Sequence, residues 1–498
     1  MRAQRVQLLA LSLAAIAFGI AMRVWIYRSS IGHLGTDEAV WGLMARHVLH
    51  GEVSAFFWGQ AYGGTQEVFP VAFLFWLFGT HLALMRVVPT LFAIAAGVVL
   101  WRAGRRLGGE VAGVSAALLV WVWPAYAAWK VQTWSGFYGS GLLYGALVLW
   151  LTLLLDEEAT TARIAFTGLV LGLAFWQTVQ AVAVIVPALA WLTFRRPRIW
   201  LRAWIAVPGV VLGALPWLIS NLRHDWWSFT VRGGAGTYTG RLHSFVTATL
   251  PELLGLRVPF AVGWTFGTAI SGLLYAALIA TLALALWRWR RSPRSLPLAV
   301  LLGYPLVSVI NAMTVESSEP RYVFMLLPAL VLVAATAMTT IPRAAIVLGV
   351  AALLSAVSLA RWIDWRDDRA AIDRFNPGEV DVWPAVHALE RAGVDRAFAH
   401  YSIAYRMTFD SHERLIVSEA DLTNLSTAAP GRVLPPAPTD YTTHRHPAYD
   451  RAVRSAPRFA YVFVRGEPGQ AKDLALLRRQ GYREQRLGTL ILMFSPTQ

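Results

Sequence analysis

The sequence has 498 residues, of which 56% are hydrophobic and 15% are charged. Soluble globular chains average about 45–50% apolar and about 25% charged residues, so the composition excludes an ordinary soluble domain and a disordered chain. The absence of cysteine excludes disulfides and a thiolate nucleophile. The net charge is +15, but the basic residues mostly separate apolar runs, which favours a membrane protein over a nucleic-acid partner. We therefore predict a polytopic α-helical membrane protein.

Runs long enough to span a bilayer need about 20 apolar residues, and the first is Val6 to Trp25. It lacks a clear small-x-small cleavage site, so we interpret it as a retained helix and not as a signal peptide. The stretch 164–194 has 31 residues and would be about 46 Å long as one helix, against a core of roughly 30 Å. Two short helices turning near Gln177 and Gln180 fit better. The other runs lie near 84–101, 111–127, 140–155, 200–219, 262–287, 296–313, 322–340 and 343–360.

These runs give about 11 transmembrane helices in a domain of residues 1–361, with a cytoplasmic N-terminus in the cell (plasma) membrane. Arginine clusters at 102–106, 195–202 and 288–294 fall on the predicted cytoplasmic side, as the positive-inside rule requires. Other cations fall on the outer side, and we interpret them as groups that the outer face needs. They are Arg46, Arg86, Lys130, Arg223, Arg232, Arg241, Arg257 and Arg321.

Residues 362–498 alternate short helical and strand patterns and predict a small extracytoplasmic α/β domain. Helices are expected at 381–393, 402–409 and 469–481, and strands at 396–401, 414–419, 458–466 and 487–496. The segment 423–447 is expected to be a long surface loop. The domain has no GxGxxG or GxxxxGK[ST] motif, so a nucleotide site is not expected there.

The first outer loop, residues 28–82, carries the densest polar pattern. Thr36 is predicted to be the N-cap of an amphipathic helix that ends near His50, with Asp37 and Glu38 in its first turn. The apolar run Val68 to Phe78 would be roughly 17 Å long as a helix, too short to span. An acid that starts a helix is often there only to stabilise it. At the outer rim of the hydrocarbon core, however, a carboxylate is costly and marks a candidate functional site.

Several segments resemble one enzyme group: GTDEAVWGLMARHVLHGE, FFWGQAYGGTQE and LFGTHLALMRVVPTLF in the loop, and GLAFWQTVQAVAVIVPAL, LPWLISNLRHDWWS, EPRYVFMLLPAL and HYSIAYRMTFDSHE beyond it. They are similar to the polyprenyl-phosphate-sugar-dependent glycosyltransferases of the glycosyltransferase-C fold. That group includes the protein O-mannosyltransferases of glycosyltransferase family 39 and the lipid A aminoarabinose transferase. The acidic pair after the first span is the specific part of a resemblance that covers most of the chain.

The resemblance implies a glycosyltransferase that moves a hexose or pentose from a polyprenyl-phosphate donor to an extracytoplasmic glycan, lipid or protein. It gives Asp37 the role of general base or hydroxyl-orienting group, with Glu38 as its neighbour. Arginine binds phosphate oxygens bidentately, so Arg321 is the first choice for the lipid phosphate, although it could instead be an interface anchor beside Tyr322. The second choices are Lys130, Arg86 and Arg46. The candidates for binding substrate are His33, Gln60, Tyr62, Gln66, Glu67, Glu319 and Tyr322.

No cofactor is assigned, and a divalent cation is left open. Its ligands could come from Asp37, Glu38, Glu67, Glu316, Glu319 and His33, but no spacing signature such as HExxH is present. The stretch KVQTWSGFYGS also lacks the second acid of some relatives. The alternatives are a secondary transporter or lipid flippase, and a non-catalytic envelope scaffold. Internal repeats and mid-span charges are typical of transporters, and neither is seen, which favours the enzyme.

Overall fold

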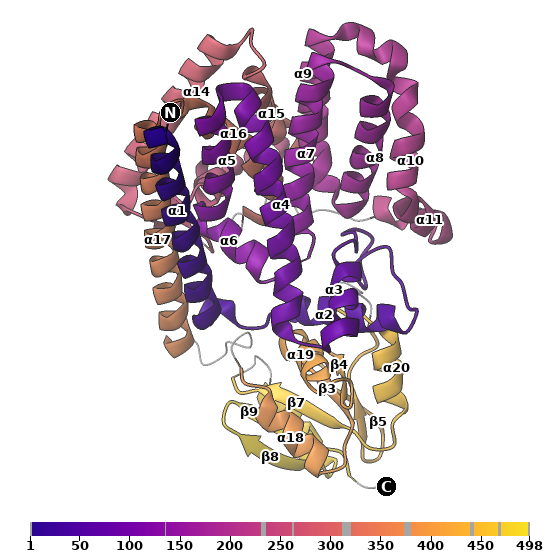
Figure 1. Ribbon diagram of the computed structural model, residues 1–498. Helices are drawn as coiled ribbons and strands as arrows, with labels where there is room; N and C mark the ends of the chain where they lie inside the picture. The colour runs from indigo at the N-terminus through magenta and orange to yellow at the C-terminus, as the bar shows by residue number, and fades with distance from the viewer. Residues whose placement is uncertain are drawn as a thin grey trace. The chain divides into compact units, whose positions relative to one another are not determined.

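The structure is a computed structural model that describes residues 2–134, 136–230, 236–260, 263–310, 320–372, 380–438, 443–466 and 470–496. The chain forms two compact units, coloured along the sequence in Figure 1. The membrane unit comprises Met1–Ser29, Ala61–Pro70 and Ala83–Trp365. The mixed unit comprises Ser30–Gln60, Val71–Leu82 and Arg366–Gln498. The proposed division at residue 361 stays a prediction.

The membrane unit is almost entirely helical. Its helices, some of which extend past its boundaries, are α1 (Arg2–Arg28), α4 (Leu82–Gly108), α5 (Glu110–Val122), α6 (Ala125–Gln132), α7 (Tyr138–Glu157), α8 (Thr161–Gln177), α9 (Val182–Arg195), α10 (Val207–Gly213), α11 (Leu215–Arg223), α12 (Tyr238–Ser244), α13 (Leu250–Leu253), α14 (Gly267–Trp289), α15 (Ser295–Ser308), α16 (Leu327–Ala337) and α17 (Ile341–Ile372). A short antiparallel pair, β1 (Arg257–Val258) and β2 (Gly263–Trp264), precedes α14.

Long apolar helices confirm a multi-pass membrane protein. Among the described residues, six helices are long and apolar enough to cross a bilayer, or up to eight if each bent pair counts as one span. The bent pairs are α5 with α6, at 68°, and the segment Pro197–Gly213 with α11, at 61°. The predicted number of about 11 spans is not confirmed.

The apolar stretch 164–194 forms two helices, as its length predicts. Helix α8 ends at Gln177 and α9 begins at Val182. Between them the Thr178 hydroxyl accepts a hydrogen bond from the backbone N–H of Gln180, which stabilises the turn. Helix α8 packs closely on α10.

The mixed unit combines helices with a five-stranded sheet. Its helices are α2 (Thr36–Leu49), α18 (Trp383–Arg391), α19 (Tyr401–Asp410), α20 (Pro447–Ser455) and α21 (Gln470–Arg479), and α3 (Val68–Phe78) lies partly in it. The sheet strands are β3 (Arg396–Ala399), β4 (Ile416–Glu419), β7 (Ala460–Val464), β8 (Arg483–Leu487) and β9 (Leu490–Phe494). Their order is β4-β3-β7-β9-β8, with β4, β3 and β7 parallel and β9 and β8 antiparallel to their neighbours.

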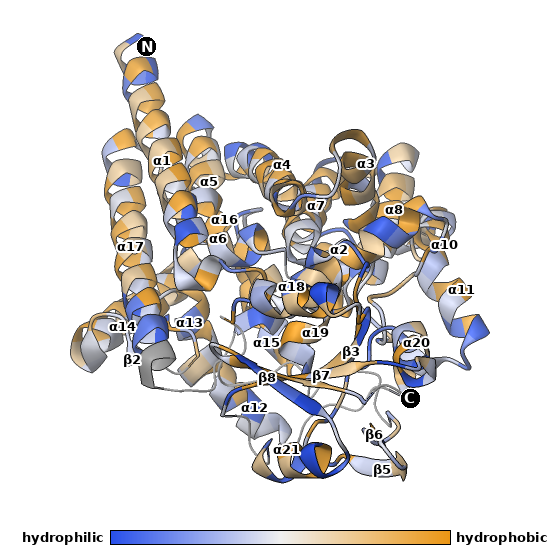
Figure 2. Cartoon of the chain, turned by 90° about the horizontal axis from the view of Figure 1, so that it is seen from below, coloured by the Kyte–Doolittle hydropathy of each residue, from blue (hydrophilic) through white to orange (hydrophobic). Residues whose placement is uncertain are grey.

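The predicted α/β pattern of the C-terminal residues is confirmed for each helix and strand named from the sequence, but three features were missed. The expected loop 423–447 contains a hairpin of β5 (Ser426–Ala429) and β6 (Arg432–Leu434). Helix α20 and strand β8 were not predicted either. Strand β8, at the sheet edge, is mostly hydrophilic where β7 is hydrophobic (Figure 2). No residue of β8 is buried, so this edge strand needs no apolar alternation.

Helix α2 carries the first-loop acids and packs against α19 of the same unit. Its N-cap is Gly35, not Thr36 as predicted. The Thr36 hydroxyl instead donates a hydrogen bond to the carbonyl oxygen of Ser402, at 2.8 Å. Because that hydroxyl is used in a tertiary contact, the helix begins one residue earlier than a local capping rule predicts.

Candidate active site

Asp37 lies in the first turn of α2 with its side chain about half exposed, at 48%. The Tyr401 hydroxyl, at the start of α19, donates a short hydrogen bond to Asp37 Oδ1. The Arg445 guanidinium lies 3.7 Å from the same oxygen. Both contacts that the described residues make with this carboxylate are at Oδ1, so Oδ2 is left for a ligand.

Tyr401 and Arg445 also support each other. Arg445 Nε donates to the Tyr401 hydroxyl at 3.1 Å, and its guanidinium lies 4.8 Å from the centre of the Phe57 ring. Burial, and then the negative charge of Asp37, raise the pKa of Tyr401, so the phenol keeps its proton and acts as a donor. The result is a carboxylate held in one orientation by a half-buried donor and a buried cation.

None of the other predicted residues of the mixed unit that the structure describes makes a hydrogen bond or an ion pair with the Asp37 carboxylate. Glu38 is buried, and its Oε2 accepts a 3.4 Å hydrogen bond from the backbone N–H of Gly35. Arg46 is buried and donates to the carbonyl of Phe409 at 2.7 Å. His33 is exposed and Gln60 half-buried. The proposed roles of Glu38 in catalysis, of Arg46 in phosphate binding and of His33 and Gln60 in substrate binding stay predictions.

Glu67, in the membrane unit, is fully buried at the centre of a polar network. Its Oε1 accepts hydrogen bonds from the Ser140 backbone N–H at 2.7 Å and hydroxyl at 2.6 Å. The Gln177 side chain donates to that hydroxyl at 2.8 Å. Burial raises the pKa of Glu67 to about 7, against the opposing effect of the hydrogen bonds from Ser140.

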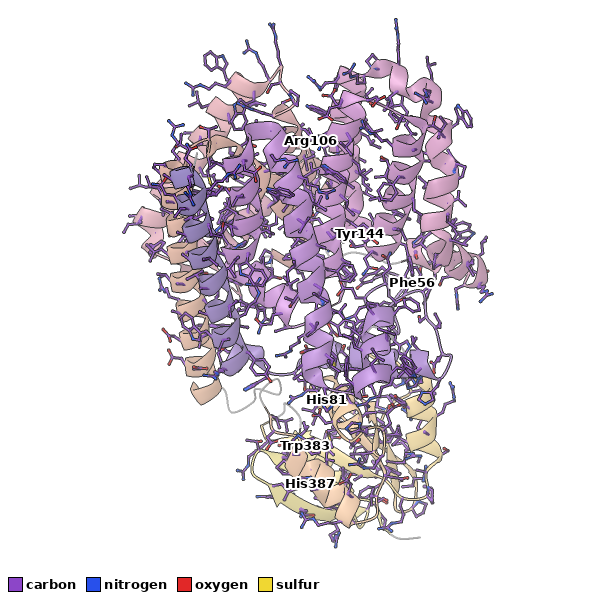
Figure 3. The ribbon with its side chains drawn as sticks, in the orientation of Figure 1. Phe56, His81, Arg106, Tyr144, Trp383 and His387 are labelled. Atoms are coloured by element: carbon purple, nitrogen blue, oxygen red, sulfur yellow. The ribbon has the colours of Figure 1, made fainter. Side chains whose placement is uncertain are left out.

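Gln66 joins the first loop to two helices of the same unit. Its amide nitrogen donates to the carbonyl of Leu173, in α8, at 2.9 Å. Its amide oxygen accepts a short hydrogen bond from the hydroxyl of Tyr144, in α7, which is labelled in Figure 3. The predicted substrate residues Gln66 and Glu67 therefore lie in a network that fixes the loop 61–67 on α7 and α8.

The predicted phosphate-binding cations of the membrane unit each lie beside an aromatic ring. Lys130 Nζ, in α6, is 4.7 Å from the ring centre of Tyr138. The Arg321 guanidinium is 4.7 Å from the ring of its neighbour Tyr322. Arg86, in α4, is buried and lies 5.7 Å from the Tyr27 ring. Tyr62 is half-buried. Glu316 and Glu319 lie outside the described residues.

Asp37 and Arg321 belong to different units, and their pairing stays a prediction. The sequence analysis did not single out Tyr401 and Arg445. The signal for them was weak: Tyr401 stands in a segment quoted only for its resemblance, and Arg445 in a stretch expected to be a loop. Among the described residues, one group of three His and Glu side chains has its possible metal-ligand atoms within 4.8 Å of one another. None of the metal ligands predicted from the sequence belongs to this group.

Comparisons with protein-family models and with curated proteins find no match. Solved structures do match. ArnT from Cupriavidus metallidurans bound to undecaprenyl phosphate is 13% identical, with a TM-score of 0.63 over 98% of this chain and 97% of that chain. The apo state of that ArnT is also 13% identical, with a TM-score of 0.63 over 99% and 98% of the two chains. The likeness confirms the expected glycosyltransferase-C type of fold.

Proposed function

We propose that this protein is an integral membrane glycosyltransferase that moves a sugar from a polyprenyl-phosphate donor to an acceptor outside the cytoplasm. The observation that carries the proposal is the carboxylate of Asp37, half exposed and fixed through one oxygen by Tyr401 and Arg445. The likeness to ArnT bound to undecaprenyl phosphate supports the donor class. We propose that the transferred sugar is a hexose or a pentose.

The reaction needs a group that orients the acceptor hydroxyl and takes its proton. In the proposed step the acceptor oxygen forms a bond to the anomeric carbon of the sugar. The bond from that carbon to the phosphate oxygen breaks, and the lipid phosphate leaves with the electron pair. Oδ2 of Asp37, which has no contact with the part of the chain that the structure describes, accepts the proton of the acceptor hydroxyl. A carboxylate already held by two donors is well suited to positioning the acceptor hydroxyl, because little further conformational entropy is lost when the substrate binds.

The departing lipid phosphate gains negative charge, which cations stabilise in the transition state. Arg321 remains the first choice for this role, with Lys130, Arg86 and Arg46 second. Of these, Arg46 has the weakest support. It already donates to the carbonyl of Phe409 and lies 4.3 Å from that residue's ring centre, so its guanidinium is engaged within the mixed unit.

The proposal includes a cytoplasmic N-terminus and an extracytoplasmic mixed unit in the plasma membrane. A donor screen tests it directly. The purified chain is incubated with polyprenyl-phosphate carriers of radiolabelled mannose, glucose or arabinose and with membranes as acceptor source. Transfer from one carrier, with release of polyprenyl phosphate, is expected. No release from any carrier, together with movement of the carriers across vesicle bilayers, would contradict it and favour a flippase.

A further inference from the structure

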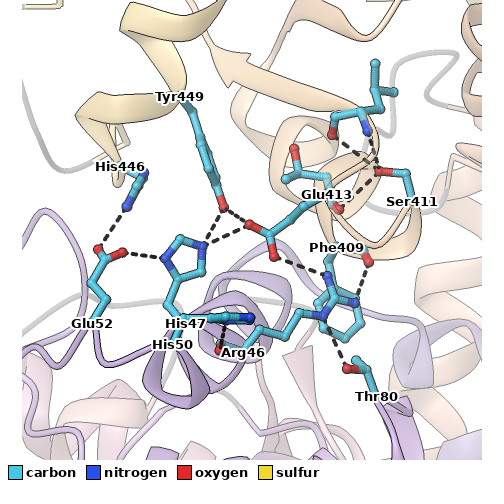
Figure 4. Close-up of polar contacts among 12 residues, drawn as sticks. Arg46, His47, His50, Glu52, Thr80, Phe409, Ser411, Glu413, His446 and Tyr449 are labelled. Carbon is cyan, nitrogen blue, oxygen red and sulfur yellow. Dashed lines mark hydrogen bonds and ion pairs between the residues drawn. The ribbon is translucent and has the colours of Figure 1, made fainter.

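A cluster of titratable side chains in the mixed unit takes no part in the proposed reaction (Figure 4). His47 lies in the last turn of α2, Glu52 follows that helix, and His446 directly precedes α20. Glu52 bridges the two rings: its Oε2 is 2.6 Å from His47 Nδ1, and its Oε1 is 3.1 Å from His446 Nε2. One ligand atom from each residue fits within 4.8 Å.

The opposite side of the His47 ring contacts a carboxylate. Its Nε2 lies 2.9 Å from Glu413 Oε1, and the same carboxylate oxygen accepts a 2.8 Å hydrogen bond from Tyr449. Histidines that bind a metal through one nitrogen commonly donate the other N–H to a carboxylate, which fixes the tautomer and the ring orientation. Here Glu413 would keep the proton on Nε2 and leave Nδ1 as the coordinating lone pair.

The His446 ring is also placed by packing. Its centre is 4.2 Å from that of Trp58 and 4.4 Å from that of Tyr449. Its Nδ1 is buried and makes no hydrogen bond with the described residues. Both imidazoles are therefore fixed by neighbours, while the Glu52 side chain between them is 51% exposed and gives an ion a path from solvent.

We propose that His47, Glu52 and His446 bind one divalent transition-metal ion, with Zn²⁺ as the best chemical fit. Two imidazole nitrogens and one carboxylate oxygen suit Zn²⁺ and its first-row neighbours, whereas Ca²⁺ and Mg²⁺ prefer sites made of oxygen alone. Three protein ligands leave a fourth position for water.

The distances permit this with small movements. Bonds of about 2.0–2.2 Å in tetrahedral geometry place ligand atoms roughly 3.3–3.6 Å apart. The present ligand atoms lie within 4.8 Å, so side-chain shifts on the order of an ångström suffice. The ion would link the end of the helix that carries Asp37 to α20, which is almost 400 residues further along the chain. Its role is to stabilise the mixed unit, independently of the proposed transfer reaction.

The competing state is a doubly protonated His47 placed between Glu52 and Glu413, with no metal. The full chain, purified without a histidine tag, is stripped with a chelator and titrated with Zn²⁺ alone. Metal content is measured by mass spectrometry and affinity by calorimetry. We expect one ion per chain and a rise in Tm on Zn²⁺ addition, and Co²⁺ should give the visible absorption of a tetrahedral complex.

Variants assign the ligands. His446→Gln and Glu52→Gln should each weaken Zn²⁺ binding by more than tenfold. Glu413→Gln should weaken it roughly 10- to 100-fold, as expected for a group that orients a ligand. Glu52→Gln is the variant least expected to disturb folding, because the Glu52 side chain is half exposed. His50→Gln is the matched control, since His50 is exposed and its ring makes one hydrogen bond with the residues that the structure describes, to the carbonyl of Arg46 at 3.1 Å. Failure of the stripped chain to bind Zn²⁺, or equal binding by all variants, would overturn the proposal.

Discussion

Replacing Tyr401 with phenylalanine tests whether the held orientation of Asp37 matters for turnover. The change removes one hydroxyl and leaves the ring, so it deletes the hydrogen bond to Asp37 and the one from Arg445. A hydrogen bond to a charged group contributes about 1.5–3 kcal/mol. Because Asp37 is half exposed, water replaces part of this, and a loss of about 1–2 kcal/mol is the better expectation.

If that energy serves to position the carboxylate in the transition state, kcat/KM for sugar transfer should fall roughly 5- to 30-fold. The same variant should lower the free energy of unfolding by a similar amount. Radiolabel transfer from a polyprenyl-phosphate donor measures kcat/KM. Thermal unfolding of the detergent-solubilised chain measures the change in stability. In the stability data, Tyr401→Phe combined with Asp37→Asn should show coupling, because the two groups touch.

Tyr461→Phe is the control for a purely structural effect. Its hydroxyl is buried and donates to the carbonyl of Val433 at 2.9 Å, within the hydrophobic core of the mixed unit. It should lose stability and keep its kcat/KM when assayed below its Tm. Wild-type kcat/KM in Tyr401→Phe, or an equal fall in Tyr461→Phe, would refute the reasoning.

Three further predictions concern the membrane unit. Gly172→Ala should lower Tm by several degrees, because a Cβ there would lie 2.2 Å from the carbonyl oxygen of Val210, whereas Gly272→Ala, with open space around it, should not. Burial raises the pKa of Glu67 to about 7 from an ordinary value near 4.5, so the folded state holds a proton that the unfolded state has lost. The free energy of unfolding should therefore fall by roughly 3 kcal/mol as the pH rises from 4.5 to 7. Glu67→Gln should flatten this part of the Tm–pH curve. An unchanged slope in that variant would contradict the assignment to Glu67. Arg321→Ala should raise KM for the lipid donor without changing KM for the acceptor, and equal changes in both would argue against a phosphate-binding role.

Helix lengths were predictable because bilayer thickness limits them. The stretch 164–194 is too long for one span, and its division near Gln177 follows from that limit and the polar side chains there. Val68–Phe78 is too short for a span and forms one helix with these bounds, as predicted. Segments that bend within a run, such as Pro197–Gly213 with α11, could not be counted this way, since hydropathy does not report a change of direction.

In the mixed unit, the elements with apolar alternation were predicted and the polar ones were not. Strand β7 is buried throughout, while every residue of β8, at the edge, is half-buried or exposed. The hairpin β5–β6 and helix α20 lie in or next to a segment whose proline and threonine content is typical of a loop. Local composition favours a loop there, and tertiary packing overrides it.

The acid of the candidate site could be proposed from its place after the first span, but its partners could not. Tyr401 is 364 residues away from Asp37 along the chain, and no local pattern joins two residues at such a separation. Arg445 is one of 42 arginines, so its type alone carries no signal. The same holds for His446, which meets Glu52 only through the packing of the mixed unit.

Loss of the Asp37 carboxylate at constant shape tests the central claim most directly. Asp37→Asn and the control Asp395→Asn, whose side chain is 67% exposed and pairs with Arg396, are assayed for transfer from the carrier that the donor screen identifies. We predict that Asp37→Asn abolishes transfer while the chain stays folded, with a fall in Tm no larger than that of Tyr401→Phe because both lose the same contact, and that Asp395→Asn transfers at the wild-type rate. Wild-type transfer by Asp37→Asn would contradict the account.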